Sequence, residues 1–171
     1  QRLFLLFQNP ILGVLAGAIL TAVIQSSSAS VGILQVLAVT GQITYGASIP
    51  IIMGQNIGTC VTAMLSSVGA NKNAKRAALV HLSFNTIGTL VWLAVFLLIQ
   101  TIWQPPLFST SASLWGIAAA HSVFNILCTL LMLPLSGFLE KFVTKIVPDA
   151  KKPEAYTELD ERLLATPLAA L

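Results

Sequence analysis

The sequence contains two long stretches without a single Asp, Glu, Lys or Arg residue. The first runs from Leu3 to Asn71 and the second from Ala77 to Leu139. A helix at the surface of a water-soluble domain needs a polar face, and these stretches contain no charge with which to build one. Each has room for more than one bilayer-spanning segment of about 20 apolar residues. Charged residues make up 9% of the whole chain, against about 25% in soluble domains. We therefore predict an all-α integral membrane protein.

The apolar part of the chain divides into four blocks. They cover approximately residues 10–40, 43–69, 77–102 and 111–138. The first block is interrupted by Gln25-Ser26-Ser27-Ser28-Ala29-Ser30, and the second by Gly54-Gln55-Asn56-Ile57-Gly58-Thr59. Because Gly and Asn favour turns, we expect a break in the helix at the second interruption. The third and fourth blocks are predicted to be uninterrupted spans.

The positive charges predict how the chain is oriented in the membrane. Residues 71–76 contain three basic residues, and further lysines begin at Lys141. Loops on the cytoplasmic side carry an excess of Lys and Arg, so residues 71–76 and 140–171 are both expected in the cytoplasm. Two spans between them return the chain to the same side. The expected location is the bacterial inner membrane or the plasma membrane, crossed several times.

The two polar interruptions predict a binding site inside the bilayer. Irregular backbone is tolerated at this depth only where it is buried in protein or lines a wet cavity. Discontinuous helices near the midplane are how many secondary transporters hold a substrate and a coupling ion. Free N–H groups at the start of a half-helix can bind an anion. Oxygen atoms of Ser, Thr, Asn and Gln can replace the water around a small cation.

The same two segments resemble the paired signatures of the sodium/phosphate cotransporter family. Members contain two inverted repeats, each with a QSSS sequence and a downstream G-x-N-I-G-T. This chain has one copy of each, and Gly69 to His81 resembles the second repeat of bacterial members. Cys60 departs from the pattern, since the family more often has Thr there. The resemblance implies one half of an inverted-repeat transporter, with a re-entrant helical hairpin, a broken helix and two further spans.

The resemblance also implies the function and its residues. The function would be symport of inorganic phosphate across the cell membrane, driven by sodium. The partners would be phosphate, sodium, the lipid bilayer and either the other repeat or a second copy of this one. No cofactor is expected beyond the coupling sodium ion. The implied phosphate-binding residues are Gln25, Ser26, Ser27, Ser28, Gln55 and Asn56, and the implied sodium ligands are Ser26, Ser27, Thr59 and Thr62.

Residues 1–139 are thus predicted to form the transmembrane repeat, and residues 140–171 a cytoplasmic linker. A PhoU-like helical domain follows the transporter part in many bacterial members. Residues 159–164 resemble the lead into that domain. Thr157-x-x-Asp160 resembles a capping box at the start of a helix.

Two other classes of function remain open from the residues alone. A membrane phosphatase would use Ser27 as nucleophile and His81 or His121 as base. Enzymes of this kind usually also contain Arg, Lys or a metal ion that stabilises the charge developing in the transition state. The apolar blocks contain neither Arg nor Lys. A non-transporting sensor or assembly module for the cytoplasmic domain would not need the two polar interruptions. Nucleic-acid binding is not expected, because no cluster of basic residues forms a surface patch.

Overall fold

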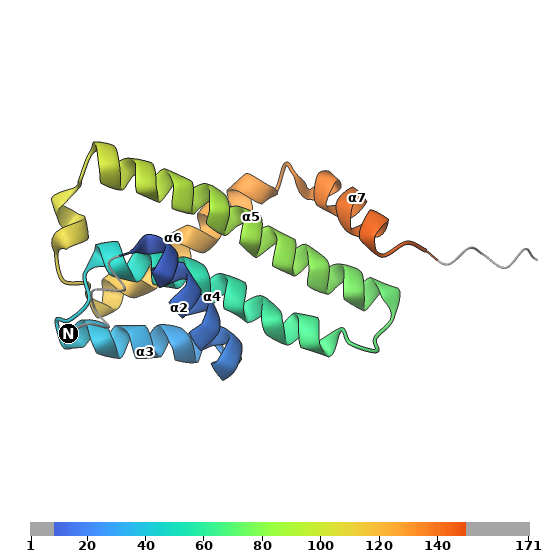
Figure 1. The fold of residues 1–171 in the computed structure, drawn as a ribbon, viewed down its shortest axis with the longest axis horizontal. Helices are drawn as coiled ribbons and strands as arrows, with labels where there is room; N and C mark the ends of the chain where they lie inside the picture. The colour runs from blue at the N-terminus through green and yellow to red at the C-terminus, as the bar shows by residue number, and fades with distance from the viewer. Residues whose placement is uncertain (1–8, 150–171) are drawn as a thin grey trace, which may run out of the picture.

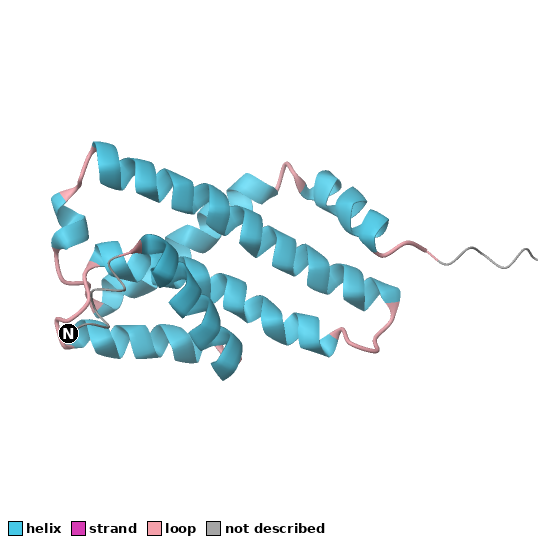
Figure 2. Ribbon diagram, in the orientation of Figure 1, coloured by secondary structure: helices cyan, strands magenta, loops and turns pink. Residues whose placement is uncertain are grey.

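The computed structural model describes residues 9–149 and is helical throughout this part. Figures 1 and 2 show the arrangement, in which helices are joined by short loops without a strand in the described residues. The elements are α2 (Pro10–Ile24), α3 (Ser27–Val39), α4 (Tyr45–Ser66), α5 (Lys72–Ile102), the 3₁₀ helix η1 (Pro106–Ser109), α6 (Leu114–Met132) and α7 (Ser136–Ile146).

The first interruption separates α2 from α3, as predicted. Gln25 adopts a left-handed conformation with φ of 57°, which ends α2. Ser26 is extended, and its hydroxyl accepts a hydrogen bond from Ala29 N, which caps the start of α3. The two helices contain 15 and 13 residues, so they are about 22 and about 20 Å long. Neither reaches across the roughly 30 Å of bilayer hydrocarbon by itself.

The predicted break in the second block is wrong. Helix α4 runs without interruption from Tyr45 to Ser66. Its glycines allow close packing instead of a turn. A Cβ added at Gly54 would overlap the carbonyl oxygen of Val14 on α2. Small residues at such positions let helix backbones approach closely within a membrane.

The polar side chains of this segment also fit an unbroken helix. Asn56 Nδ2 donates to Ile52 O at 2.9 Å, and Thr59 Oγ1 donates to Gln55 O at 2.9 Å. Each side chain thus bonds to the carbonyl one turn earlier along the same helix. These two side chains therefore find partners without any unwinding of the helix.

Helix α4 lies at the centre of the bundle, between the α2–α3 hairpin and α5 (Figure 1). Gly13 and Gly17 of α2 contact Pro50 and Ile51 of α4. On the other side, Thr89 Oγ1 of α5 donates to Met53 O at 3.2 Å in the buried interior. The core of the bundle therefore forms around the middle of α4.

Within residues 9–149, three helices are long and apolar enough to cross a membrane: α4, α5 and α6. Helix α5 covers the predicted third block as one uninterrupted helix of 31 residues, but it begins at Lys72, so residues 72–76, expected to lie in a loop, are helical. Trp103 follows it and is 78% exposed, as suits a residue at the membrane interface. The fourth block is shorter than predicted. Its helix ends at Met132, two residues before Pro134, which has no backbone N–H with which to continue the helical hydrogen bonds.

The remaining apolar residues of the fourth block enter a separate helix, α7. The boundary predicted between residues 139 and 140 falls inside this helix. Arg76 at the start of α5 donates to Val147 O just beyond α7. The basic residues at the start of α5 and the end of α7 therefore lie on the same side of the bundle, as two spans require. The predicted capping box at Thr157 lies outside the described residues.

Candidate functional site

The tip of the α2–α3 hairpin lies beside the middle of α4. Gln55 is the link, because its Nε2 donates to the Ser30 carbonyl at 3.0 Å and its side chain is fully buried. Gln55 lies ten residues after Tyr45, about 15 Å along the helix. That position is near the midpoint of a 22-residue span. This bond therefore holds the first turn of α3 beside the middle of α4.

The tip offers hydrogen-bond donors to an anion. Ser27 and Ser28 are the first two residues of α3, and their backbone N–H groups have no acceptor among the described residues. Ser26 Oγ lies 3.3 Å from Ser28 Oγ. Gln25 and Ser28 are exposed, while Ser26 and Ser27 are half-buried. The positive end of the α3 dipole adds to the attraction for a negative charge.

Three predicted site residues share one face of α4. Gln55, Thr59 and Thr62 are spaced i, i+4 and i+7, which aligns them along the helix. Gln55 is buried, Thr59 is half-buried and Thr62 is exposed. The row therefore leads from the interior of the bundle to its surface.

The packing of α2 on α4 sets this row level with the hairpin tip. The two helices run in the same direction, since Gly54 contacts Val14 and Ala18, and Gly58 contacts Ala18 and Ala22. The next turn of each helix carries Gln25 on α2 and the Thr59–Thr62 segment on α4. The structure thus brings the predicted residues of the tip and of α4 to one level.

Asn56 is the exception among the predicted residues. It lies on the face of α4 that also carries Met53 and Cys60. Cys60 Sγ donates to His81 O of α5 at 3.4 Å, so this face is turned toward α5. Asn56 therefore belongs to the packing between the spans and is not brought to the tip.

Two buried residues that flank the tip, Thr21 and Ser30, are not among the site residues predicted from the sequence. Both side chains are fully buried. Their hydroxyl oxygens and Gln55 Oε1 have no hydrogen-bond partner within the described residues. Buried polar atoms normally have a partner, which can be water or an ion. The signal in the sequence is their spacing, one helical turn before Gln25 and one turn after Ser26.

The histidines are not joined to the serines. No hydrogen bond connects Ser27 to His81 or His121 among residues 9–149. Asn85 Nδ2 donates to His81 O at 3.0 Å, and Asn125 Nδ2 donates to His121 O at 2.8 Å. The two histidine carbonyls thus receive the same bond, each within its own helix. The described residues also contain no group of three His, Cys, Asp or Glu side chains that could hold a metal.

These features define a multi-pass membrane protein with a polar site inside its helix bundle. The chain belongs to the Na+/Pi-cotransporter family, whose model matches residues 1–133. It is 34% identical over 134 residues to the uncharacterized protein YqeW of Bacillus subtilis, covering 78% of this chain and 43% of YqeW. It is 31% identical over 167 residues to the putative inorganic phosphate export protein YjbB of Escherichia coli K12, covering 94% of this chain and 30% of YjbB.

A human relative shows a shorter but closer match. The human sodium-dependent phosphate transport protein 2B is 41% identical over 96 residues, which is 53% of this chain and 14% of that protein. The chain spans less than half the length of each of these three relatives. No solved structure gives a significant match.

Proposed function

We propose that this chain is one repeat of a sodium-coupled symporter of inorganic phosphate. The observation that carries the proposal is the position of the α3 N-terminus, whose free N–H groups lie level with the oxygen-bearing face of α4 at mid-span. The family suggests the substrate and the ion, and two relatives are named for inorganic phosphate export and for sodium-dependent phosphate transport.

Phosphate would bind at the hairpin tip. The N–H groups of Ser27 and Ser28 and the neighbouring hydroxyls offer several donors to one tetrahedral anion. Helix N-termini are common anion sites because unpaired amides and the helix dipole act together. Gln25, Ser26, Ser27 and Ser28 are the proposed contacts at the tip, and Gln55 supports the tip from α4.

Sodium would bind between the tip and α4. Small hard cations take oxygen ligands, and the proposed ligands Ser26, Ser27, Thr59 and Thr62 supply only oxygen atoms. Thr59 Oγ1 donates its proton to Gln55 O, which leaves its lone pairs available to a cation. Cation and anion at neighbouring positions attract each other strongly in a medium of low dielectric constant. Each would therefore raise the affinity of the site for the other.

The hairpin would be re-entrant, entering and leaving on the same side of the membrane. Its two helices are each too short to span, and its tip lies level with the middle of α4. The exposure of Gln25, Ser28 and Thr62 fits a surface that is completed by another repeat, from the same protein or from a second copy. The basic residues at the start of α5 and the end of α7 would face the cytoplasm.

Transport in proteoliposomes tests the proposal. The full-length parent protein is reconstituted, and movement of radiolabelled phosphate is followed under a sodium gradient of either direction and under a potassium gradient. We expect phosphate to follow the sodium gradient, and Ser27→Ala to abolish this movement. Ser122→Ala is the matched control, because Ser122 is an exposed serine on α6, away from the tip.

The outcomes separate the parts of the proposal. Phosphate movement of equal rate in sodium and in potassium would remove sodium coupling but keep phosphate as the substrate. No movement under any gradient would favour the sensor or assembly role for the cytoplasmic part. Equal loss in Ser27→Ala and Ser122→Ala would show that the assay reports folding.

A further inference from the structure

Helix α7 carries two kinds of apolar stripe. Leu139 and Val143 are buried against the bundle. Phe138, Phe142 and Ile146 are exposed and lie at i, i+4 and i+8, so they form a separate stripe beside the buried one. The rings of Phe138 and Phe142 are stacked with centroids 6.4 Å apart. The second stripe has no covering element in the described residues.

Two lysines border this exposed apolar stripe. Lys141 and Lys145 are spaced i and i+4, and at 100° per residue their stripe lies next to that of Phe138 and Phe142. Both lysines are exposed. A helix with an apolar face edged by lysines is typical of helices that lie in the plane of a membrane interface.

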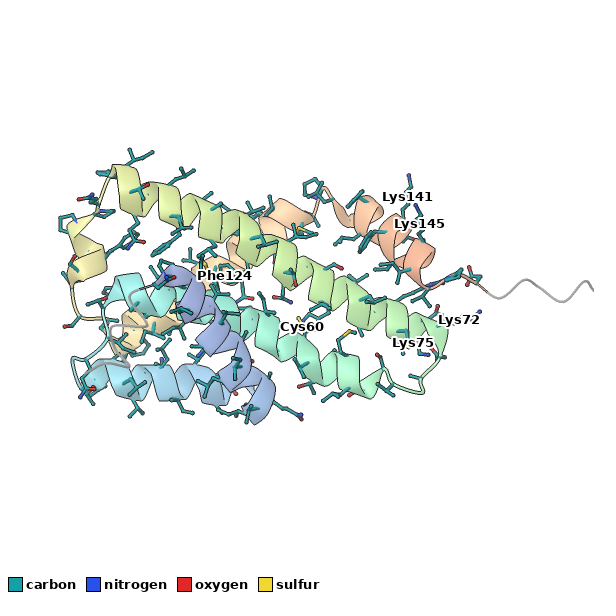
Figure 3. The ribbon with its side chains drawn as sticks, viewed as in Figure 1. Cys60, Lys72, Lys75, Phe124, Lys141 and Lys145 are labelled. Atoms are coloured by element: carbon teal, nitrogen blue, oxygen red, sulfur yellow. The ribbon has the colours of Figure 1, made fainter. Side chains whose placement is uncertain are left out.

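The start of α5 adds two further lysines at the same end of the molecule. Lys72 and Lys75 are exposed, and Figure 3 shows them at the same end as Lys141 and Lys145. The ion pair recorded within residues 9–149 joins Arg76 to Asp149 and involves none of these four lysines. Positive charge is thus concentrated here without acidic partners in the described chain.

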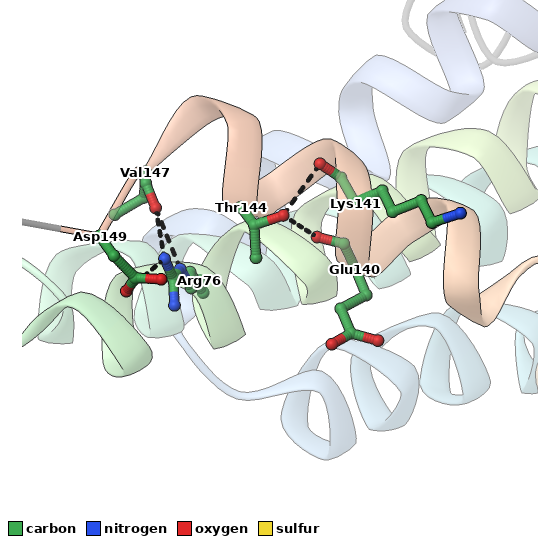
Figure 4. A network of polar contacts seen from close by, with 6 residues as sticks. All are labelled: Arg76, Glu140, Lys141, Thr144, Val147 and Asp149. Atoms are coloured by element: carbon green, nitrogen blue, oxygen red, sulfur yellow. Dashed lines mark hydrogen bonds and ion pairs between the residues drawn. The ribbon is translucent and has the colours of Figure 1, made fainter.

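Helix α7 is held to the bundle through Arg76. Arg76 Nε and Nη2 donate to Val147 O at 3.0 and 2.9 Å, and Nη2 also contacts Asp149 Oδ1 at 2.8 Å (Figure 4). On α7 itself, Thr144 Oγ1 donates back to the carbonyls of Glu140 and Lys141. The Arg76 bonds hold the end of α7 against α5, and the burial of Leu139 and Val143 defines the side of α7 that packs inward. The phenylalanine and lysine stripes are therefore presented outward in a defined orientation.

The position of α7 places this surface at a membrane border. Helix α6 is a span that ends at Met132, and α7 begins four residues later at Ser136. A short turn after a span leaves the next helix close to the lipid headgroups. The exposed apolar stripe would otherwise face water.

We propose that α7 and the first turn of α5 form a docking surface for acidic phospholipids. Phe138, Phe142 and Ile146 insert at the boundary between headgroups and acyl chains. The four lysines contact headgroup phosphates, reaching them with flexible side chains whose apolar stems remain in the lipid. Basic clusters beside a span on the cytoplasmic side are attracted to the anionic lipids of that leaflet. The surface is separate from the hairpin tip and does not depend on transport.

Spin-labelled lipids test the proposal directly. The full-length protein is reconstituted in phosphatidylcholine vesicles that contain a trace of spin-labelled phosphatidylglycerol or of spin-labelled phosphatidylcholine. The fraction of immobilised label is measured for the wild type and for a variant with all four lysines changed to Gln. We expect a severalfold preference for phosphatidylglycerol in the wild type and equal immobilisation of both lipids in the Gln variant.

A charge-matched variant and the salt dependence complete the test. Changing the four lysines to Arg keeps the charge and should keep the preference. High salt should weaken the preference in the wild type, because screening reduces contacts between exposed charges. Equal immobilisation of both lipids by the wild type at low salt would overturn the proposal without any variant. An unchanged preference in a folded Gln variant would also overturn it.

Discussion

Gln55 donates its side-chain amide to the Ser30 carbonyl, and this bond joins the middle of α4 to the first turn of α3. The same side chain keeps its Oε1 buried without a hydrogen-bond partner in the described residues. One residue thus supports the hairpin tip and offers an oxygen atom near it. Its two roles can be separated by experiment.

Replacing Gln55 by Met should weaken the binding of phosphate. Loss of a hydrogen-bonding group from a site that holds a charge costs about 1.5–3 kcal/mol, so the phosphate concentration for half-maximal transport should rise about tenfold or more. Gln35→Met is the control, because Gln35 Nε2 donates to Leu114 O at 3.1 Å and joins α3 to α6 away from the tip. An equal change in both variants would show that Gln55 only supports the hairpin.

Gly54→Ala should destabilise the protein. The added methyl group would overlap the carbonyl oxygen of Val14, and overpacking of this kind costs about 1–3 kcal/mol. Gly32→Ala is the control, since a Cβ at Gly32 on α3 meets nothing within 4 Å. Thermal unfolding in detergent, followed by tryptophan fluorescence, should give a lower midpoint for Gly54→Ala than for Gly32→Ala. Equal midpoints would contradict the close packing of α2 on α4.

Thr89→Val should cause a small loss of stability. Its hydroxyl donates to Met53 O across the α4–α5 interface, and hydrogen bonds between membrane helices contribute about 0.6 kcal/mol on average. Thr129 lies eight residues after His121 on α6, as Thr89 lies eight residues after His81 on α5, but the Thr129 hydroxyl bonds to Asn125 O of its own helix. Thr129→Val should therefore leave the unfolding midpoint closer to that of the wild type. A larger loss in Thr129→Val would argue against the interhelical bond.

Arg76→Gln should release the end of α7. The substitution removes both bonds to Val147 O, whereas Asp149→Asn removes only an ion pair in which the carboxylate is 81% exposed. Exposed ion pairs contribute about 0–1 kcal/mol, so the second change should have little effect. Hydrogen exchange of the α7 amides should accelerate severalfold in Arg76→Gln and remain near the wild-type rate in Asp149→Asn. Equal acceleration of exchange in both variants would show that the ion pair, and not the bonds to Val147 O, holds the end of α7.

Much of the fold follows from the pattern of charge and turn residues. The absence of charge predicts the helical membrane bundle, and the Gln25–Ser30 segment predicts where the hairpin turns. The turn was predictable because its cause is local: a left-handed Gln25 followed by a serine cap. The long span of α5 was predictable for the same reason, since its sequence contains no strong turn signal.

The course of α4 could not be predicted in this way. Glycine and asparagine favour a turn in water, but Gly54 and Gly58 lie where α2 approaches, and Asn56 bonds within its own helix. Only the position of the neighbouring helix shows whether a glycine allows close helix packing or interrupts its own helix. The sequence likewise predicted the serines of the tip but not the buried oxygens of Thr21 and Ser30, whose burial depends on contacts with α4.

The interlocking of α2 and α4 limits how these two helices can move relative to each other. Backbone carbonyl groups of α2 lie directly against Gly54 and Gly58 of α4. In the same way, the Ile51 carbonyl of α4 lies directly against Gly17 of α2. Sliding or tilting one helix would drive these groups into each other. The pair must therefore travel as one rigid body that carries the hairpin tip with it. A gate for the tip would have to open where this body meets α5 and α6, or along the exposed side of the hairpin, but not between α2 and α4.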